Sequence, residues 1–325
     1  MPSVGDWTVS PAEQPRPEDY AFDLDRALGA VVSLRATIPE DAFTAEVLGT
    51  ERAGNGVLIR RDGVILTIGY LIVEAEQVWL TLSDGRMVAG HVLAYDPESG
   101  FGLVQALARL DVPILELGNA AVTDVGTQVV VGGAGGRHHS VAAHIAVKQE
   151  FAGYWEYLLD EAIFTVPSHP QWGGSALIGP MGDLLGIGSL QLQRESKGER
   201  REDLNMIVPI DLLKPIYDDL LTLGRPNRPA RPWLGLYATE IEDRVVVAGL
   251  AGHGPAKAAK LRMGDIVLGV AGGEVHGLAD LWRKVWALGQ AGVEVPLTVH
   301  RDGRLVEARI TSADRSQFLK APRMH

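Results

Sequence analysis

Residues 54–72 decide the fold; they read GNGVLIRRDGVILTIGYLI. Two β-type runs, 56–59 and 64–67, flank the polar segment 61–63, Arg-Asp-Gly. Asp-Gly between such runs is a strong hairpin signal, because glycine tolerates the positive φ that the turn requires. The stretch therefore predicts two short antiparallel strands joined by a tight turn.

The same pattern of short strands and turns extends along the chain. A second hairpin is predicted at 78–88, and further β-type runs stand at 128–131 and 184–187. The 38 glycines and 18 prolines suit many short strands joined by turns. Strands of this length and spacing predict a barrel or a sandwich.

Residues 209–223, PIDLLKPIYDDLLTL, change the period of the pattern. Their apolar residues recur at helical spacing, which predicts a single helix that closes the first domain. These residues are Leu212, Leu213, Ile216, Leu220 and Leu223. The following segment, GRPNRPARP, is rich in proline and predicts a stiff linker.

A chain of 325 residues exceeds what one core usually organises, so more than one domain is expected. The predicted organisation is a polar N-terminal arm 1–22, a first domain 23–223, a Pro-rich linker 224–232, a second domain 233–315 and a C-terminal tail 316–325. The second domain is expected to alternate strands with two helices and to end in a hairpin that turns at Asp302-Gly303.

Charge and cysteine content restrict the classes of function. The formal net charge of -11 argues against nucleic acid as a partner, which requires a basic face. Cysteine is absent, so neither a disulfide framework nor a thiolate site is expected. No basic-then-apolar leader and no long apolar run is visible. As written, the sequence indicates a cytoplasmic protein without a transmembrane segment; a periplasmic location would require a leader that is missing here.

Three blocks of the first domain resemble the HtrA (high-temperature-requirement) family of serine proteases. The blocks are GNGVLIRRDGVILTIGYLI from Gly54, LTLSDGRMVAGHVLAYDPESGFGLVQ from Leu80 and HPQWGGSALIGPMGDLLGIG from His169. NMIVPIDLLKPI, from Asn205, is similar to the family's closing segment. The resemblance implies a mainly β fold with two six-stranded β-barrels of the chymotrypsin or trypsin type, and it also implies homotrimers.

The second domain resembles the PDZ domain that follows the protease in that family. GPAKAAKLRMGDIV from Gly254 and VHRDG from Val299 match the PDZ pattern. An α/β PDZ domain is therefore expected after the two barrels. Such a domain adds a peptide to its sheet as a strand and holds the peptide's C-terminal carboxylate with backbone N–H groups.

The resemblance also indicates where the family's catalytic triad would stand. The base position holds Tyr70, the position of the orienting carboxylate holds Gly100, and the nucleophile position holds Gly173. A one-residue shift of the last block places Trp172 at the nucleophile position instead, and a two-residue shift offers Ser175 as the least unfavourable nucleophile. No triad member is retained in the unshifted alignment, and hydrolysis of this type needs a hydroxyl, an imidazole and a carboxylate. The interpretation at this point is a degenerate triad and no enzyme, whereas the family as a whole implies a serine-type endopeptidase.

Histidines offer two weaker alternatives. His169 stands beside Ser168 and near Ser175, so the choice is between an improvised Ser-His pair and the favoured loop histidine in solvent. His138, His139 and His144 could suggest a metal site, but no carboxylate stands at a suitable spacing. No metal and no cofactor is therefore expected.

Peptide binding is expected in the PDZ domain. The carboxylate loop would comprise Trp233, Leu234, Gly235 and Leu236, and the opposing helix would run from about Leu278 to Leu288. From that helix the expected groove residues are Leu281, Trp282 and Val285.

The resulting functional hypothesis is a non-catalytic HtrA-like pseudoprotease that binds peptide segments or protein C-termini as a scaffold or regulator. The alternatives are an active HtrA-type endopeptidase in protein quality control and a chaperone-like holdase. The expected partners are unfolded or C-terminal peptide segments of other proteins.

Overall fold

A computed structural model describes residues 7–195 and 201–321 of the chain. The chain forms two compact units. Unit 1 comprises the chain up to Gln149, then Glu161–Asn227, then the segment from Lys320 onward, and unit 2 comprises Glu150–Asp160 and Arg228–Leu319. The first six residues of the predicted arm and the last four of the predicted tail lie outside the described residues.

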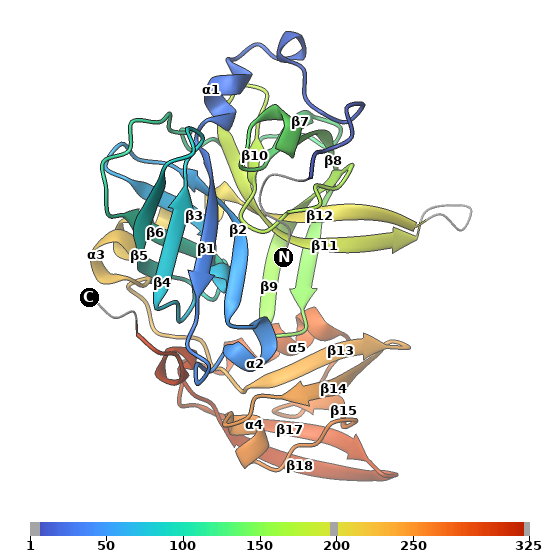
Figure 1. Ribbon diagram of the computed structural model, residues 1–325. Coiled ribbons are helices and arrows are strands. Elements are labelled where there is room, and N and C mark those ends of the chain that lie inside the picture. The colour runs from blue at the N-terminus through green and yellow to red at the C-terminus, as the bar shows by residue number, and fades with distance from the viewer. Residues whose placement is uncertain (1–6, 196–200, 322–325) are drawn as a thin grey trace. The chain divides into compact units, whose positions relative to one another are not determined.

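Six antiparallel strands close the first barrel of unit 1, in the order β1-β2-β3-β6-β5-β4 (Figure 1). The turn predicted in the opening stretch is present, and Gly63 adopts a φ of +93° in it. The strands are β1 Val31–Thr37, β2 Glu51–Leu58, β3 Val64–Ile68, β4 Gln77–Thr81, β5 Met87–Tyr95 and β6 Phe101–Ala106.

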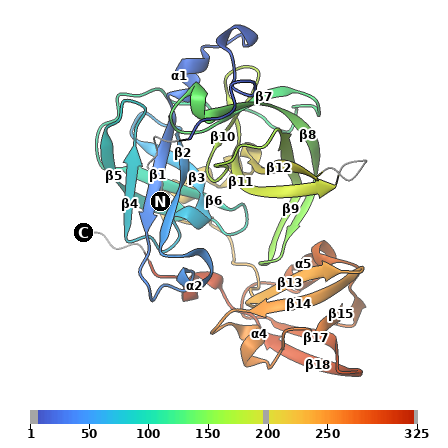
Figure 2. The same cartoon turned by 45° about the vertical axis from the view of Figure 1, so that its right-hand side comes forward.

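Six further strands close the second barrel, in the order β10-β11-β12-β9-β8-β7, and the two barrels stand side by side in unit 1 (Figure 2). The β8–β9 hairpin extends into the segment 150–160, so its tip is counted with unit 2. The strands are β7 Gln128–Gly132, β8 Ser140–Gly153, β9 Tyr157–Val166, β10 Ala176–Ile178, β11 Leu184–Glu195 and β12 Arg201–Pro209.

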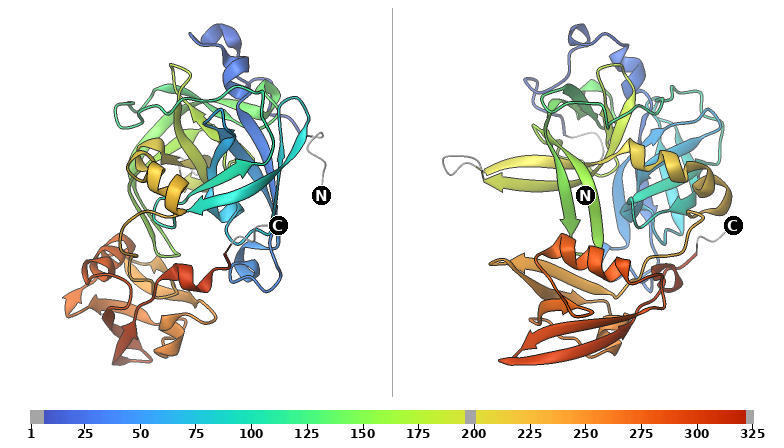
Figure 3. Two further views of the ribbon diagram at one scale, coloured as in Figure 1. Left: turned by 90° about the vertical axis from the view of Figure 1, so that its left-hand side faces the viewer. Right: turned by 180° about the vertical axis from the view of Figure 1, so that it is seen from behind.

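The helix predicted over 209–223 is broken into three pieces. Two 3-10 turns, η4 Ile210–Leu212 and η5 Lys214–Ile216, precede the helix α3 Tyr217–Leu223. Pro215 explains the break, because proline has no amide hydrogen and its ring clashes with the preceding turn of an α-helix. The helix α3 contacts β5 of the first barrel (Figure 3). The other short helices of unit 1 are η1 Pro17–Asp19, α1 Leu24–Leu28, α2 Ala45–Leu48, η2 Gly69–Leu71 and η3 Arg137–His139.

Unit 2 is built on one sheet in the order β13-β14-β15-β17-β18, with β16 paired to β15. Its predicted last hairpin is present, with Asp302 at φ +49° and Gly303 at φ +78°. The elements are β13 Leu236–Ile241, β14 Arg244–Leu250, α4 Pro255–Ala258, β15 Ile266–Val270, β16 Gly273–Glu274, α5 Leu278–Ala287, β17 Glu294–Arg301, β18 Arg304–Thr311 and η6 Arg315–Phe318.

Helix α5 packs on this sheet through one apolar face. Leu281, Trp282 and Val285 are fully buried in the core of unit 2, which also contains Leu234 and Leu236. Their spacing of three and four residues places them on one side of the helix. The observed fold is mainly β, with two barrels followed by a smaller α/β unit, and it confirms the predicted fold class.

No helix among residues 7–195 and 201–321 is both long enough and apolar enough to traverse a bilayer.

Candidate functional site

Tyr70 and Gly173 lie together in unit 1. Tyr70 follows strand β3 in the turn η2, and its hydroxyl donates to the carbonyl of Ser189 on β11 at 2.8 Å. A Cβ atom added to Gly173 would lie 2.8 Å from the Tyr70 hydroxyl oxygen. The phenol therefore occupies the space beside Gly173 that a side chain at this position would need.

Gly100 lies beside the backbone that precedes Tyr70, and Trp172 lies next to the phenol itself. The carbonyl of Gly100 accepts from the amide of Gly69, the residue before Tyr70, at 2.7 Å. Burial raises the pKa of the Tyr70 hydroxyl, and a hydrogen bond from the Trp172 side chain offsets part of that rise. At neutral pH the phenol is therefore a neutral hydrogen-bond donor and not a base.

Asn55 fixes the loop that carries Gly173. Its Nδ2 donates to the carbonyls of Gln171 and Gly173 at 2.9 and 3.2 Å, and its Oδ1 accepts from the amide of Ala134 at 2.9 Å. The Asn55 amide itself also donates to the Gly173 carbonyl, at 2.8 Å. Sequence reasoning missed this residue. The available signal was a single amide side chain inside the otherwise apolar strand GNGVLI.

Ser175 is buried behind this loop. Its hydroxyl donates to the carbonyl of Trp172 at 2.8 Å, and its side chain is fully inaccessible to solvent. The backbone of Ser175 is held too, because its amide donates to the carbonyl of Trp172 and its carbonyl accepts from the amide of Gly188. The hydroxyl is therefore turned inward in this structure.

His169 is fully buried, so the interpretation as a loop histidine in solvent is wrong. Its Nδ1 accepts from the amide of Gln171 at 3.0 Å, and its Nε2 lies 2.7 Å from the carbonyl of His139. Burial lowers the pKa of His169 to about 4, so the ring is neutral and carries its proton on Nε2. These backbone partners occupy both ring nitrogens, and the predicted alternative of a Ser-His pair with Ser168 or Ser175 has no such hydrogen bond among the described residues.

Among residues 7–195 and 201–321, no three His, Cys, Asp or Glu side chains gather as a metal site would need. His138 bonds instead to the Gln14 side chain, and His139 to the carbonyl of Gly135.

A second candidate site lies in unit 2, in the loop before β13. Gly235 adopts a φ of +70°, and the amides of Leu234 and Leu236 point to one acceptor. That acceptor is the carboxylate of Glu156, at 3.0 Å from the Leu234 amide and 2.9 Å from the Leu236 amide. Successive N–H groups around a residue in the left-handed region form an anion-binding concavity. The loop thus binds a carboxylate in this structure.

The first predicted loop residue, Trp233, takes a structural place. Its amide and carbonyl pair with Ala313, and its ring lies 4.8 Å from the ring of Phe318. Its side chain is buried. The carboxylate is therefore held by the loop backbone after Trp233.

Glu156 itself is almost fully buried, at 9% exposure. Burial raises the pKa of its carboxyl to about 7, although the amides of Leu236, Leu234 and Gly235 and the charge of Arg315 all favour the ionised form. The loop was predicted from the sequence, but its occupant was not. No local pattern around residue 156 indicates that its side chain reaches residues almost eighty positions later in the chain.

Of the predicted groove residues on α5, Trp282 reaches toward the same segment. Its indole Nε1 donates to the carbonyl of Gly153 at 3.1 Å. Leu281 and Val285 lie in the apolar core of unit 2.

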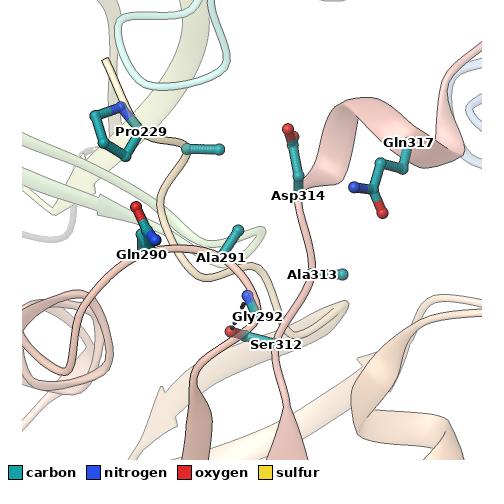
Figure 4. Close-up of a pocket in the computed structure, with 9 residues that line it drawn as sticks. Pro229, Gln290, Ala291, Gly292, Ser312, Ala313, Asp314 and Gln317 are labelled. Carbon is teal, nitrogen blue, oxygen red and sulfur yellow. Dashed lines mark hydrogen bonds between the residues drawn. The ribbon is translucent and has the colours of Figure 1, made fainter.

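A separate hollow of about 340 Å³ opens elsewhere in unit 2 (Figure 4). The amide of Gly292 donates to the Ser312 hydroxyl there at 3.2 Å, and the neighbouring side chains are mostly small. Its lining residues come from neither β13 nor α5, so it is distinct from the carboxylate loop.

Two known protein families match the two predicted domains of the chain separately. Residues 54–187 match the trypsin-like peptidase domain, and residues 232–311 match the PDZ domain. A probable periplasmic serine endoprotease of the DegP-like type from Pseudomonas fluorescens is 28% identical over 275 residues, which are 79% of this chain and 55% of that protein. The serine endoprotease DegS of Escherichia coli is 23% identical over 315 residues, 91% of this chain and 86% of that protein.

Solved structures of related proteins show the same fold. The HtrA-type protease AlgW with a decapeptide superposes with a TM-score of 0.54 at 20% identity, covering 92% of this chain and 98% of AlgW. The serine endoprotease from Yersinia pestis gives a TM-score of 0.53 at 22% identity, covering 89% and 95%. In sequence and in fold the chain is therefore similar to HtrA-type proteases. It spans about half the length of the DegP-like relatives that it matches.

The similarity to these proteases corrects one prediction made from the sequence. The expectation that the chain is not an enzyme is contradicted, because the HtrA relatives matched here are named serine endoproteases. The comparisons support the part of the prediction that describes an HtrA-type chain with a trypsin-like domain followed by a PDZ domain.

Proposed function

We propose that this HtrA-type chain recognises peptide segments that end in a free carboxylate, and that it does so through the groove between β13 and α5. The observation that supports this proposal most strongly is the carboxylate held by the amides of Leu234 and Leu236. A loop that satisfies one carboxylate with backbone N–H groups offers the same donors to a peptide C-terminus.

The neighbouring elements suit strand addition. β13 stands at one end of the sheet order, so one of its edges is not paired with another strand of the sheet. The amide of Ala238 already donates across this edge, to the carbonyl of Tyr154 at 2.9 Å. Main-chain hydrogen bonds of this kind give affinity without fixing the sequence of the ligand. The related protease AlgW has been solved with a decapeptide, which supports the same class of ligand here.

Binding of a labelled decapeptide tests the proposal. We expect fluorescence anisotropy to show binding when the peptide has a free C-terminus, and a loss of about tenfold to hundredfold when that end is amidated. The physical reason is the loss of charge-assisted hydrogen bonds, each worth about 1.5–3 kcal/mol. Equal affinity for the free and amidated peptides would refute the carboxylate mode.

Serine endoproteolysis, the activity in the relatives' names, is the second candidate for the trypsin-like domain. If Tyr70, Gly100 and Gly173 stand at the triad positions, as we propose, hydrolysis has to use other groups. Ser168 and Ser175 are the hydroxyls of the segment that carries Gly173. Labelling with a fluorophosphonate followed by peptide mapping tests this function: an adduct on Ser175 that disappears in Ser175→Ala supports it, and an unlabelled chain contradicts it.

The relatives also bear on the compartment. The DegP-like proteins are named periplasmic, and this favours the periplasmic alternative over the cytoplasmic one. Fractionation of cells that produce the native protein decides between them.

A further inference from the structure

The tip of the β8–β9 hairpin, residues 150–160, lies in the groove where the proposed peptide would bind. Three contacts define its position. The Glu156 carboxylate accepts from the Leu234 and Leu236 amides, the Tyr154 carbonyl accepts from the Ala238 amide at 2.9 Å, and the Gly153 carbonyl accepts from the Trp282 indole at 3.1 Å. The tip thus engages the carboxylate loop, the edge of β13 and the helix α5 at once.

These contacts follow the order that an added antiparallel strand would have, with one between the Ala238 and Tyr154 backbones and the other made by the Glu156 side chain. Going back two residues from Glu156 to Tyr154 corresponds to going forward two residues from Leu236 to Ala238. An antiparallel strand pairs residues in this opposite order. A peptide whose C-terminal carboxylate occupied the loop would follow the same path along β13 and would need the same donors. The tip and a peptide therefore cannot occupy the groove together.

Further contacts hold the tip in this place. Ala152 packs against the apolar core of unit 2. Arg283 of α5 pairs with both ends of the segment, at 2.5 Å from Glu150 and 2.6 Å from Asp160. Each of these ion pairs contributes little alone, because the arginine side chain is 47% exposed.

The backbone conformation of Glu156 indicates that its side chain serves to hold the tip at the carboxylate loop. Strand β8 ends at Gly153 and β9 begins at Tyr157, so the loop has three residues, and its last residue, Glu156, adopts a φ of +61°. A three-residue hairpin loop usually places glycine at this left-handed position. Glutamate is disfavoured there by its Cβ atom, yet its carboxylate is the group that reaches the loop amides.

We propose that residues 150–160 are an internal ligand of the PDZ groove, with the Glu156 carboxylate in the place of a peptide's C-terminal carboxylate. An external peptide then binds only by displacing the tip, so the tip regulates the site. This inference rests on the proposed peptide-binding function and adds its regulation.

The internal ligand also indicates the class of peptide that competes best. Tyr154 lies two residues before the carboxylate-bearing residue, and its ring is 6.0 Å from the ring of Tyr237 on β13. A peptide with an aromatic side chain at the third position from its C-terminus reproduces this pair. Aromatic pairs at such distances add to the affinity beyond the area that they bury.

Competition in the full-length chain tests the inference. The probe is a fluorescein-labelled decapeptide that ends in Gly-Tyr-Trp-Val with a free carboxylate. We expect Glu156→Ala to bind it about tenfold to hundredfold more tightly than the wild type, because the competing carboxylate is gone. Glu242→Ala is the matched control: Glu242 is an exposed glutamate of unit 2 at φ +48°, in the β13–β14 turn. Its affinity should equal that of the wild type.

Hydrogen–deuterium exchange of the wild-type chain gives a second test that needs no variant. Saturating peptide should increase exchange in residues 150–160, which lose their partners, while the amides of residues 234–238 stay protected because the peptide takes over the same donors. Peptide binding with an unchanged exchange rate in 150–160, or equal affinities for the wild type and Glu156→Ala, would overturn the internal-ligand proposal and leave the peptide-binding proposal intact. Failure of both proteins to bind the free-carboxylate peptide would instead overturn the proposed function and the inference together.

Discussion

Tyr70 and Gly173 share a space that admits only one side chain. The Tyr70 hydroxyl already bonds to the Ser189 carbonyl at 2.8 Å, and a Cβ atom at Gly173 would lie 2.8 Å from the hydroxyl oxygen. Contacts this short to a Cβ atom do not persist, so the phenol would have to move. Because it is half-buried and hydrogen-bonded, the movement costs free energy.

We expect Gly173→Ala to lower the free energy of unfolding of unit 1 by about 1–3 kcal/mol. In the Tyr70→Phe background the same substitution should cost at least about 1 kcal/mol less, because the clashing hydroxyl is absent. Urea denaturation of the four proteins measures this cycle. Gly252→Ala is the control, since a Cβ atom at Gly252 meets nothing within 4 Å. Additive effects in the cycle would show that the two residues do not compete for space.

Glu156 gives the groove a dependence on pH. The pKa of its carboxyl is about 7 where it is buried in the loop, against an ordinary value of 4.5 when exposed. At pH values between these two pKa values, the Glu156 carboxyl is therefore protonated in the docked tip and ionised in the released tip. Docking is fully favourable below the ordinary value and weakens as the pH rises through about 7.

We expect the wild-type chain to bind the free-carboxylate peptide more tightly at pH 8 than at pH 5.5. The affinity should rise by at most about tenfold for each pH unit between the two pKa values of Glu156. The peptide's own terminal carboxylate stays ionised over this range. The charged side chain that acts on Glu156 is Arg315, which favours the ionised carboxylate. Anisotropy titrations of the wild type and Glu156→Gln at both pH values test this, and a variant with the same pH dependence as the wild type would contradict it.

The helices and turns differ in how far their formation depends on neighbouring residues alone. Hairpin turns such as those at Gly63 and Asp302 were predictable, because positive φ at Asp-Gly is a property of two neighbouring residues. The helix predicted over 209–223 has the right apolar period, but Pro215 restricts the α-helix to Tyr217–Leu223. Periodicity reports which face is buried and does not report the backbone hydrogen bond that proline removes.

In the candidate sites too, features that depend on distant partners could not be predicted from the sequence. The residues around Tyr70 could be named from sequence blocks, and the structure places Tyr70 and Gly173 together. The burial of His169 and Ser175, in contrast, depends on partners in other strands and loops. The polar character of histidine and serine predicts exposure on average, and only tertiary hydrogen bonds reverse it. Glu156 was missed for the same reason, since its partners are 78 and 80 residues away.

At the scale of the whole molecule, the units are not consecutive in the chain. Unit 2 takes its first eleven residues, Glu150–Asp160, from within a hairpin of the second barrel, and the remainder from Arg228–Leu319. A division based on composition places the boundary at the Pro-rich linker, because that is where the sequence changes character. Composition carries no record of a hairpin tip that packs with another unit.

This chain path predicts coupled unfolding. Strands β8 and β9 are continuous with a segment that packs in unit 2, so the second barrel and unit 2 share the free energy of docking residues 150–160. Glu156→Ala removes the carboxylate from the Leu234 and Leu236 amides and leaves the positive φ of residue 156 in place. Losing charge-assisted hydrogen bonds of this kind costs about 1.5–3 kcal/mol. For a unit of about a hundred residues this corresponds to a fall in Tm of roughly 6–24 °C.

Differential scanning calorimetry measures this coupling. We expect the wild type to unfold in closely spaced transitions and Glu156→Ala to show an earlier, separate transition for unit 2. The free-carboxylate peptide should raise that transition again, because a ligand that binds only the folded state stabilises it. Glu242→Ala should leave the trace unchanged, and superimposable traces for Glu156→Ala and the wild type would show that the carboxylate does not hold the tip in unit 2.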